Sequence, residues 1–310
     1  MRLASTLVFV TLLFAAAAGC GSSEDQSGAT VATTTGIWAD VTERVAGEDA
    51  SVEQVIPDAT SPHEFQLSAE DRATIEDSLL LVYNGADLEA GIPIDEIDVP
   101  KFAVADHVGE LLPFEEAGEH AEGEEEHAES GQDPHVWMDP SRVAAALPAL
   151  ADALAEADPD HANGYRSRAE SYAAELSALD AEIERQVGSI PPDNRKLVTS
   201  HDAMGYFAER YGLEVLATPF PASGPEAEAS AQTIKEVEDA VRSSGVPTIF
   251  AQETDDPEVL ERIAGETGVG IEEHLLVEAP GESGSYLSML RQDAELLRNG
   301  LTDTAPTATQ

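Results

Sequence analysis

Basic residues are scarce in this sequence. Its 310 residues include 16 Lys and Arg against 61 Asp and Glu, which gives a formal net charge of −45. Such a charge repels the phosphates of DNA and RNA and anionic lipid headgroups, and it attracts cations without selectivity. The composition therefore excludes nucleic-acid binding.

Cysteine and long apolar runs are also scarce. Cys20 is the single cysteine, so the chain cannot form an internal disulfide. The apolar run from Leu7 to Ala18 is shorter than the roughly 20 residues that a membrane-spanning helix needs. It follows Arg2 and precedes small residues, which is the pattern of a secretory signal peptide. We therefore expect an exported protein.

The residues around Cys20 resemble the bacterial lipobox, in which the cysteine is lipidated and becomes the mature N-terminus. Ala17 departs from that motif, which usually has Leu at this position. We predict a leader over residues 1–20, lipidation of Cys20 as a membrane anchor, and a flexible polar tether over residues 21–31.

From Ala32 onward, short apolar runs alternate with segments of helical period, which is typical of βαβ units. The segment from Pro159 to Val187 keeps apolar residues at helical spacing over roughly 28 residues, or about 40 Å of helix. We predict an α/β fold of two lobes, each with a mostly parallel central sheet flanked by helices, joined by this long, rigid helix. The predicted boundaries are residues 32–158 for the N-terminal lobe, 159–188 for the linking helix, 189–301 for the C-terminal lobe and 302–310 for a disordered tail.

Two short segments predict helix starts. Ser68 with Asp71 forms a capping-box pattern, since a serine caps the helix and an acid follows three positions later. Asp139 followed by Pro140 is a second start, because Asp accepts from first-turn amides and Pro has no amide to leave unpaired. His135 is therefore expected on a short loop just before a helix.

Other polar side chains follow predicted strands. His63 comes after "VEQVIPDA", His201 after "RKLVTS", and Glu278 ends "VGIEEHLLVE". The carboxyl ends of parallel strands face a common cleft, so these side chains and His135 can converge from two lobes. Three imidazoles with one carboxylate suit four-coordinate Zn²⁺. Spacing alone leaves an alternative open, in which these are scattered loop histidines.

Acidic residues and histidines are concentrated in residues 115–131, which include His120 and His127. This stretch cannot bury a core and is expected to be a loop. Its two interpretations are an accessory zinc-collecting segment and simple solvated charge. The remaining histidines are predicted to be structural and not metal ligands; they are His107, His161 and His274. Three aromatic side chains of one helix are predicted to pack in the core, those of Tyr206, Phe207 and Tyr211.

From Ala32 to Leu301 the sequence resembles the zinc- and manganese-binding solute-binding proteins of bacterial ABC importers, the cluster A-I or TroA-like family. The resemblance rests on "PDATSPHEFQLSAED", "VYNGADLEAGI", "DPHVWMDP" and "TSHDAMGYFAERYGLE", with "IFAQETDDPEVLERIAGETGV" and "SYLSML" following in the expected order. It implies two α/β lobes bridged by one long helix.

The resemblance also implies that His63, His135 and His201 are metal ligands. The family's usual fourth ligand is an Asp, and Glu278 stands at the matching position. Glu253 is a competing carboxylate that we expect to orient an imidazole instead. Manganese members typically replace the third histidine by a carboxylate, whereas His201 keeps a nitrogen, and imidazole suits Zn²⁺ better than Mn²⁺.

The sequence thus predicts a monomeric extracytoplasmic zinc receptor that delivers Zn²⁺ to an ABC permease driven by a cytoplasmic ATPase. The alternatives are a manganese receptor, or a metal-binding adhesin or zinc buffer on the same fold. A zinc hydrolase is disfavoured, because "HEFQL" has Leu67 where the HExxH motif needs its second histidine. With imidazole pKa values near 6.5, zinc affinity is expected to fall by roughly two to three orders of magnitude from pH 7.5 to 5.5.

Overall fold

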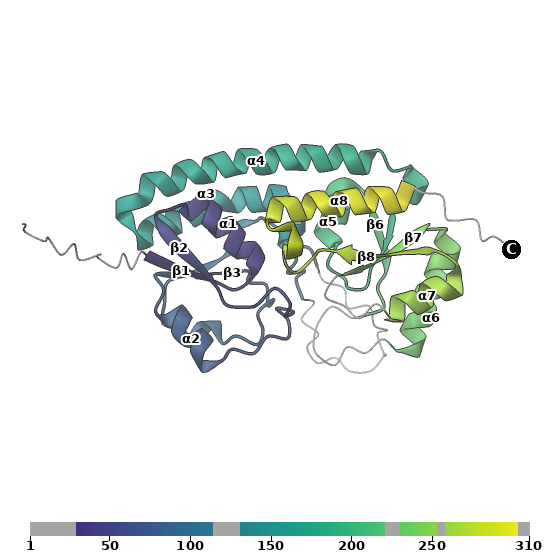
Figure 1. The fold of residues 1–310 in the computed structure, drawn as a ribbon, viewed down its shortest axis with the longest axis horizontal. Coiled ribbons are helices and arrows are strands. Elements are labelled where there is room, and N and C mark those ends of the chain that lie inside the picture. The colour runs from purple at the N-terminus through teal and green to yellow at the C-terminus, as the bar shows by residue number, and fades with distance from the viewer. Residues whose placement is uncertain (1–28, 114–130, 221–229, 253–257, 303–310) are drawn as a thin grey trace, which may run out of the picture.

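A four-stranded parallel sheet and two short parallel strand pairs lie beneath a shared layer of long helices (Figure 1). The computed structural model describes residues 29–113, 131–220, 230–252 and 258–302. We call the four-stranded sheet and the helices within residues 36–157 the N-terminal lobe, and the two strand pairs with the helices within residues 205–302 the C-terminal lobe. The predicted α/β fold with parallel sheets is confirmed.

The N-terminal sheet has the strand order β2-β1-β3-β4, and every neighbouring pair is parallel. Successive residues of β1 face opposite sides, as the strand period requires. Val31 enters the core shared with α1, whereas Ala32 enters a second core with Ile75 of α2. The elements of this lobe are β1 (Ala29–Thr33), α1 (Gly36–Ala46), β2 (Ala50–Gln54), α2 (Ala69–Glu76), β3 (Leu80–Tyr83), β4 (Lys101–Ala103) and α3 (Pro140–Ala157).

The C-terminal lobe contains two short parallel pairs, β5 with β6 and β7 with β8. A parallel bridge between Thr199 and Phe250 connects the two pairs. The elements are β5 (Lys196–Val198), α5 (Gly205–Tyr211), β6 (Glu214–Ala217), α6 (Ala231–Ser244), β7 (Thr248–Gln252), α7 (Glu258–Thr267), β8 (Gly270–Leu275) and α8 (Tyr286–Thr302). Short 3₁₀ turns occur at Ile94–Glu96, Val104–His107, Val136–Met138, Pro159–His161, Pro192–Asn194 and Gly281–Ser283.

Helix α4 (Ala162–Gly188) is the predicted long helix, and it runs along both lobes in Figure 1. Its 27 residues correspond to about 40 Å at 1.5 Å per residue. The buried side chains recur every three or four residues and form one apolar stripe against α1, α3 and α8. They are Tyr165, Ala169, Tyr172, Leu176, Leu179, Ile183 and Val187.

Both predicted helix starts are present. Ser68 Oγ accepts from the amide of Asp71, and the Asp71 carboxylate accepts from the amide of Ser68. Asp139 Oδ1 accepts from the amide of Ser141 at 2.8 Å at the start of α3. Within the described ranges, no helix is both long and apolar enough to cross a membrane.

Some predicted boundaries differ from the observed ones. Strand β1 begins at Ala29, inside the predicted tether, because residues 29–31 already pair with β2. Strand β8 ends at Leu275, so Glu278 lies beyond the strand and not at its end. Helix α8 includes Thr302 of the predicted tail. The predicted leader, Cys20 and almost all of the acidic loop lie outside the described residues.

Candidate metal centre

Three histidines that are distant in sequence meet between the lobes. His63 lies in the loop between β2 and α2, His135 directly precedes the turn that leads into α3, and His201 lies between β5 and α5. The Nε2 atom of His135 is 3.3 Å from that of His63 and 3.3 Å from that of His201. One nitrogen from each ring lies within 4.8 Å of the other two. These side chains thus form a group able to hold a metal ion.

Asp133 orients the ring of His135. Its Oδ1 accepts from the His135 backbone amide at 2.9 Å and lies 2.8 Å from His135 Nδ1. A carboxylate at this distance favours the tautomer with the proton on Nδ1, which leaves the Nε2 lone pair facing the other two histidines. Burial raises the pKa of Asp133 to about 7.

Burial keeps the imidazoles neutral. It lowers the pKa of His135 to about 3. Burial, and then the neighbouring His135, lower the pKa of His63 to about 3. Burial likewise lowers the pKa of His201 well below its usual value. The rings are therefore neutral at neutral pH, and their pKa values lie well below the 6.5 assumed from sequence.

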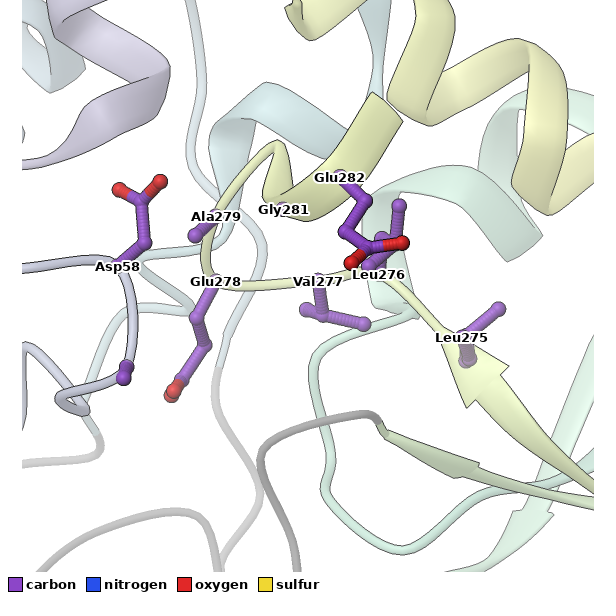
Figure 2. A pocket seen from close by; sticks show the side chains of 9 residues that line it. Asp58, Leu275, Leu276, Val277, Glu278, Ala279, Gly281 and Glu282 are labelled. Atoms are coloured by element: carbon purple, nitrogen blue, oxygen red, sulfur yellow. The ribbon is translucent and has the colours of Figure 1, made fainter. Parts of the chain in front are cut away.

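Glu278 lies beside the histidines on the segment that follows β8. It is 8% exposed, and its Oε1 accepts from Ser61 Oγ at 3.0 Å. The same oxygen is 4.0 Å from His63 Nε2. Glu278 also lines a pocket of about 560 Å³ together with Asp58 and Glu282 (Figure 2). A carboxylate is thus available at the edge of the imidazole cluster.

The loop that carries His135 is fixed by side chains from other elements. Asn84 Nδ2 donates to the carbonyl of Pro134 at 2.9 Å. The backbone amide of Asn84 donates to the buried carboxylate of Glu89 at 2.8 Å. From the other lobe, Tyr206 Oη donates to the carbonyl of Asp133 at 2.8 Å. The position of His135 is therefore set by both lobes.

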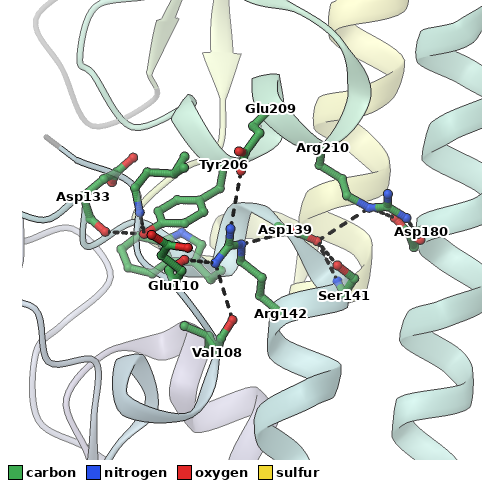
Figure 3. Close-up of polar contacts among 12 residues, drawn as sticks. Val108, Glu110, Asp133, Asp139, Ser141, Arg142, Asp180, Tyr206, Glu209 and Arg210 are labelled. Atoms are coloured by element: carbon green, nitrogen blue, oxygen red, sulfur yellow. Dashed lines mark hydrogen bonds and ion pairs between the residues drawn. The ribbon is translucent and has the colours of Figure 1, made fainter. Parts of the chain in front are cut away.

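Arg142 of α3 strengthens this support (Figure 3). Its guanidinium lies 4.6 Å from the centre of the Tyr206 ring and donates to the carbonyl of Glu110 at 2.5 Å. It also approaches Glu209 of α5 at 3.4 Å. Arg142 thus connects the end of the described segment 29–113 to the helix that follows His201.

Sequence reasoning missed several of these groups. Asp133 was present in the quoted "DPH" pattern, and its two-residue spacing from His135 was a usable signal. Ser61, Asn84 and Tyr206 gave no local signal, because their partners are far away in the sequence. Tyr206 was predicted to be core, and it is fully buried, but its hydroxyl also supports the site.

The other candidate residues fall into two groups. Glu253, His120 and His127 are outside the described residues. The predicted structural histidines lie away from the cluster. His107 stacks on Phe102, with ring centres 4.6 Å apart. His161 Nδ1 lies 2.6 Å from Asp158, and His274 is exposed on β8.

Comparison with known proteins identifies the family. Residues 31–300 match the family ZnuA, described as "Zinc-uptake complex component A periplasmic". The chain is 30% identical over 308 residues to the manganese-binding lipoprotein MntA of Halalkalibacterium halodurans, covering 96% of this chain and 98% of that protein. It is 30% identical over 279 residues to the iron-binding protein YfeA of Yersinia pestis, covering 87% and 85%.

A zinc-binding relative is similar at the same level. The zinc-binding lipoprotein AdcA of Streptococcus pneumoniae is 29% identical over 276 residues, which cover 86% of this chain and 54% of AdcA. The chain therefore spans about half the length of AdcA. The named relatives bind manganese, iron or zinc, so similarity alone leaves the metal open.

Solved structures agree with the fold. The periplasmic zinc-binding protein TroA of Treponema pallidum superposes with a TM-score of 0.78 at 25% identity, covering 89% of this chain and all of that one. The laminin-binding protein Lmb of Streptococcus agalactiae gives a TM-score of 0.75 at 28% identity, covering 88% and 99%. Because the family model spans nearly the whole described chain, this protein belongs to the ZnuA/TroA family of non-enzymatic, metal-binding solute-binding lipoproteins of ABC importers.

Proposed function

We propose that this protein is an extracytoplasmic zinc receptor that delivers Zn²⁺ to the membrane permease of an ABC importer with a cytoplasmic ATPase. The 3.3 Å spacing of His63 and His201 Nε2 from His135 Nε2 carries the proposal. Nitrogen ligands about 2.0–2.1 Å from a tetrahedral Zn²⁺ lie about 3.3–3.4 Å apart. Two of the three nitrogen–nitrogen separations thus match the edge of a zinc tetrahedron, and the third lies within 4.8 Å.

Glu278 is the fourth ligand in this proposal. Its carboxylate is nearly buried, and Ser61 holds it at 4.0 Å from His63 Nε2. This separation is slightly longer than the edge of a zinc tetrahedron, so a small side-chain rotation brings an oxygen to the ion. Glu thereby takes the role usually filled by Asp, and its additional methylene supplies the reach.

The neutral histidines favour zinc over manganese. Imidazole nitrogen suits Zn²⁺, whereas Mn²⁺ prefers oxygen ligands and is at the bottom of the divalent affinity order. Manganese is the second candidate, because MntA, a relative matched along almost its whole length, is named as manganese-binding. A manganese site would depend more on Glu278 than on His201.

A competition titration tests the metal assignment. The purified protein is titrated with Zn²⁺, Mn²⁺ and Fe²⁺ against a chromophoric chelator, beside His201→Ala and the matched control His161→Ala. We expect one tight zinc site, which weakens by roughly 100-fold or more in His201→Ala and is unchanged in His161→Ala. Tighter manganese or iron binding, or zinc binding indifferent to His201, would contradict the proposal.

A growth experiment tests delivery. Cells lacking this gene should grow poorly when zinc is chelated, and added zinc should rescue them where manganese does not. Cells carrying Cys20→Ser should release the protein into the surrounding fluid, because the proposed lipid anchor is lost. Retention of this variant at the membrane would refute anchoring through Cys20.

A further inference from the structure

Two ligand-bearing segments from different lobes touch through one side chain, Trp137. Its indole Nε1 donates to the carbonyl of Val277 at 2.7 Å. Val277 directly precedes Glu278, and the segment crosses toward the N-terminal lobe in Figure 2. Trp137 itself follows His135 by two residues and is 1% exposed. This hydrogen bond thus joins parts of the chain separated by 140 residues.

The same indole also contacts a histidine of the cluster. The rings of Trp137 and His135 are 5.3 Å apart at an interplanar angle of 69°, an edge-to-face arrangement. On the backbone side, Tyr286 Oη of α8 donates to the carbonyl of Trp137. Trp137 is therefore held by α8 while it touches His135 and the residue before Glu278.

A second side chain, that of Asp293, holds the segment before Glu278 one residue earlier, at Leu276. The amide of Leu276 donates to Asp293 Oδ1 at 2.9 Å, and Asp293 is fully buried on α8. Adjacent residues of the segment are thus fixed in turn, Leu276 by Asp293 and Val277 by Trp137. With the two preceding residues fixed, the backbone of Glu278 is held on its N-terminal side, and its carboxylate lies beside Ser61 and His63.

We propose that Trp137 is a positioning residue for metal binding, which couples His135 to Glu278 by anchoring the carbonyl of Val277. The inference rests on the proposed function, because it assumes that Glu278 is a ligand. Buried outer groups that orient ligands change metal affinity by about 10- to 100-fold when removed. A donor lost from a buried carbonyl also leaves that carbonyl without its partner.

The chain supplies a matched control, because it contains two tryptophans. Trp38 is also 1% exposed and packs edge-to-face on Trp137 with ring centres 6.3 Å apart. Its Nε1 has no hydrogen-bond partner in the described structure. Trp38→Phe therefore removes the same atoms as Trp137→Phe without removing a hydrogen bond.

The test is a double-mutant cycle read by zinc competition titration of the purified protein. Trp137→Phe should weaken zinc binding about tenfold, whereas Trp38→Phe should change it less than about threefold. In a Glu278→Ala background, Trp137→Phe should have less than about a twofold effect, because the residue that it positions is gone. Equal losses in the two Phe variants, or a loss undiminished without Glu278, would overturn the inference.

A second variant, Asp293→Ala, changes a residue of α8 outside the metal cluster. Asp293→Ala removes the acceptor of Leu276 and should also weaken zinc binding severalfold, again only while Glu278 is present. It replaces Trp137→Phe if that variant does not fold by circular dichroism. Wild-type protein that binds zinc no more tightly than His201→Ala would refute the proposed function. Tight wild-type binding with no effect from either positioning variant would refute this inference alone.

Discussion

In the N-terminal lobe, His135 is fully buried, its Nδ1 faces Asp133, and Asn84 holds the neighbouring carbonyl. In the C-terminal lobe, His201 is held through its backbone, since its carbonyl accepts from Thr199 Oγ1 at 2.8 Å. Among the described residues, no carboxylate accepts from the Nδ1 of His201. Within the described ranges, a carboxylate thus orients the ring of His135, whereas the hydrogen bond that holds His201 from outside the cluster is made to its backbone.

A similar difference between the lobes is found at the carboxylate of Glu278. Glu278 belongs to the C-terminal lobe, yet Ser61 and Trp137, from the N-terminal lobe, hold it and the residue before it. The N-terminal sheet is also one continuous set of four strands, whereas the C-terminal strands form two pairs joined by a bridge. The comparison teaches that the described side-chain contacts to His135 Nδ1 and to the Glu278 carboxylate come from the N-terminal lobe, while Tyr206 and Asp293 of the C-terminal lobe hold the backbone nearby.

The most severe test of this asymmetry compares two alanine substitutions. His135→Ala should lower zinc affinity by roughly 1,000-fold, since it removes the ligand that a carboxylate orients and leaves the buried Asp133 without its imidazole partner. His201→Ala should cost less, roughly 100-fold, because its ring is less restrained. Competition titration of both variants gives the ratio, and a larger loss in His201→Ala would reverse the proposed order.

Removing the orienting carboxylate tests the cause of the asymmetry. Asp133→Ala should weaken zinc binding by about 10- to 100-fold, because His135 then samples other orientations and is less basic. Asp202→Ala is the matched control in the C-terminal lobe, since this neighbour of His201 makes no hydrogen bond to its ring in the described structure. Similar losses in the two variants, measured by the same titration, would remove the basis of the comparison.

Lowering the pH from 7.5 to 5.5 should have only a small effect on zinc affinity. Because the pKa values of His63 and His135 are about 3, protons do not compete with zinc at these rings between pH 7.5 and 5.5. Two carboxyl groups near the cluster gain a proton in this interval, Asp133 with a pKa of about 7 and Asp202 with a pKa of about 6. Neither is one of the proposed ligands, so affinity should fall by no more than about tenfold. The two to three orders expected from a pKa of 6.5 would contradict the buried, neutral cluster.

The lowered histidine pKa values also determine how the stability of the metal-free protein changes with pH. A histidine whose folded pKa lies below its unfolded pKa of about 6.5 binds protons more readily when unfolded. The three site histidines therefore stabilise the unfolded state increasingly as the pH falls from about 6.5 toward 3. Denaturant titrations of metal-free protein at pH 7 and 5 should show this loss, and His135→Gln should reduce it.

Arg142 should affect folding more than metal binding. Arg142→Met keeps most of the side-chain volume but removes the donors to Glu110 and Glu209 and the charge over Tyr206. We expect a loss of about 1–2 kcal/mol in the free energy of unfolding, with zinc affinity changed less than about threefold. A tenfold loss of affinity at unchanged stability would instead make Arg142 part of the binding machinery.

The fold was predictable because its signals are local. The apolar stripe of α4, the cap at Asp139 and the capping box at Ser68 each depend on residues within a few positions of one another. The meeting of His63, His135 and His201 followed from the common edge of parallel strands together with the family resemblance. These arguments need no knowledge of side-chain packing.

The supporting contacts were not predictable for the opposite reason. Trp137 and Val277 are 140 residues apart, Ser61 and Glu278 are 217 apart, and Tyr206 and Asp133 are 73 apart. Burial of the imidazoles, which lowers their pKa values, also results from packing of the two lobes. Reference pKa values therefore predict a steeper pH dependence than the buried imidazoles do, although they were assigned to the residues that the structure brings together.

Helix α4 is continuous over 27 residues and packs on α1 and α3 at one end and on α5 and α8 at the other. A helix with an unbroken ladder of hydrogen bonds bends gently along its length and does not swivel at a point. The two lobes therefore share one continuous rod, and any change in their relative position has to be accommodated by gentle bending along α4 instead of rotation about a single hinge residue within it.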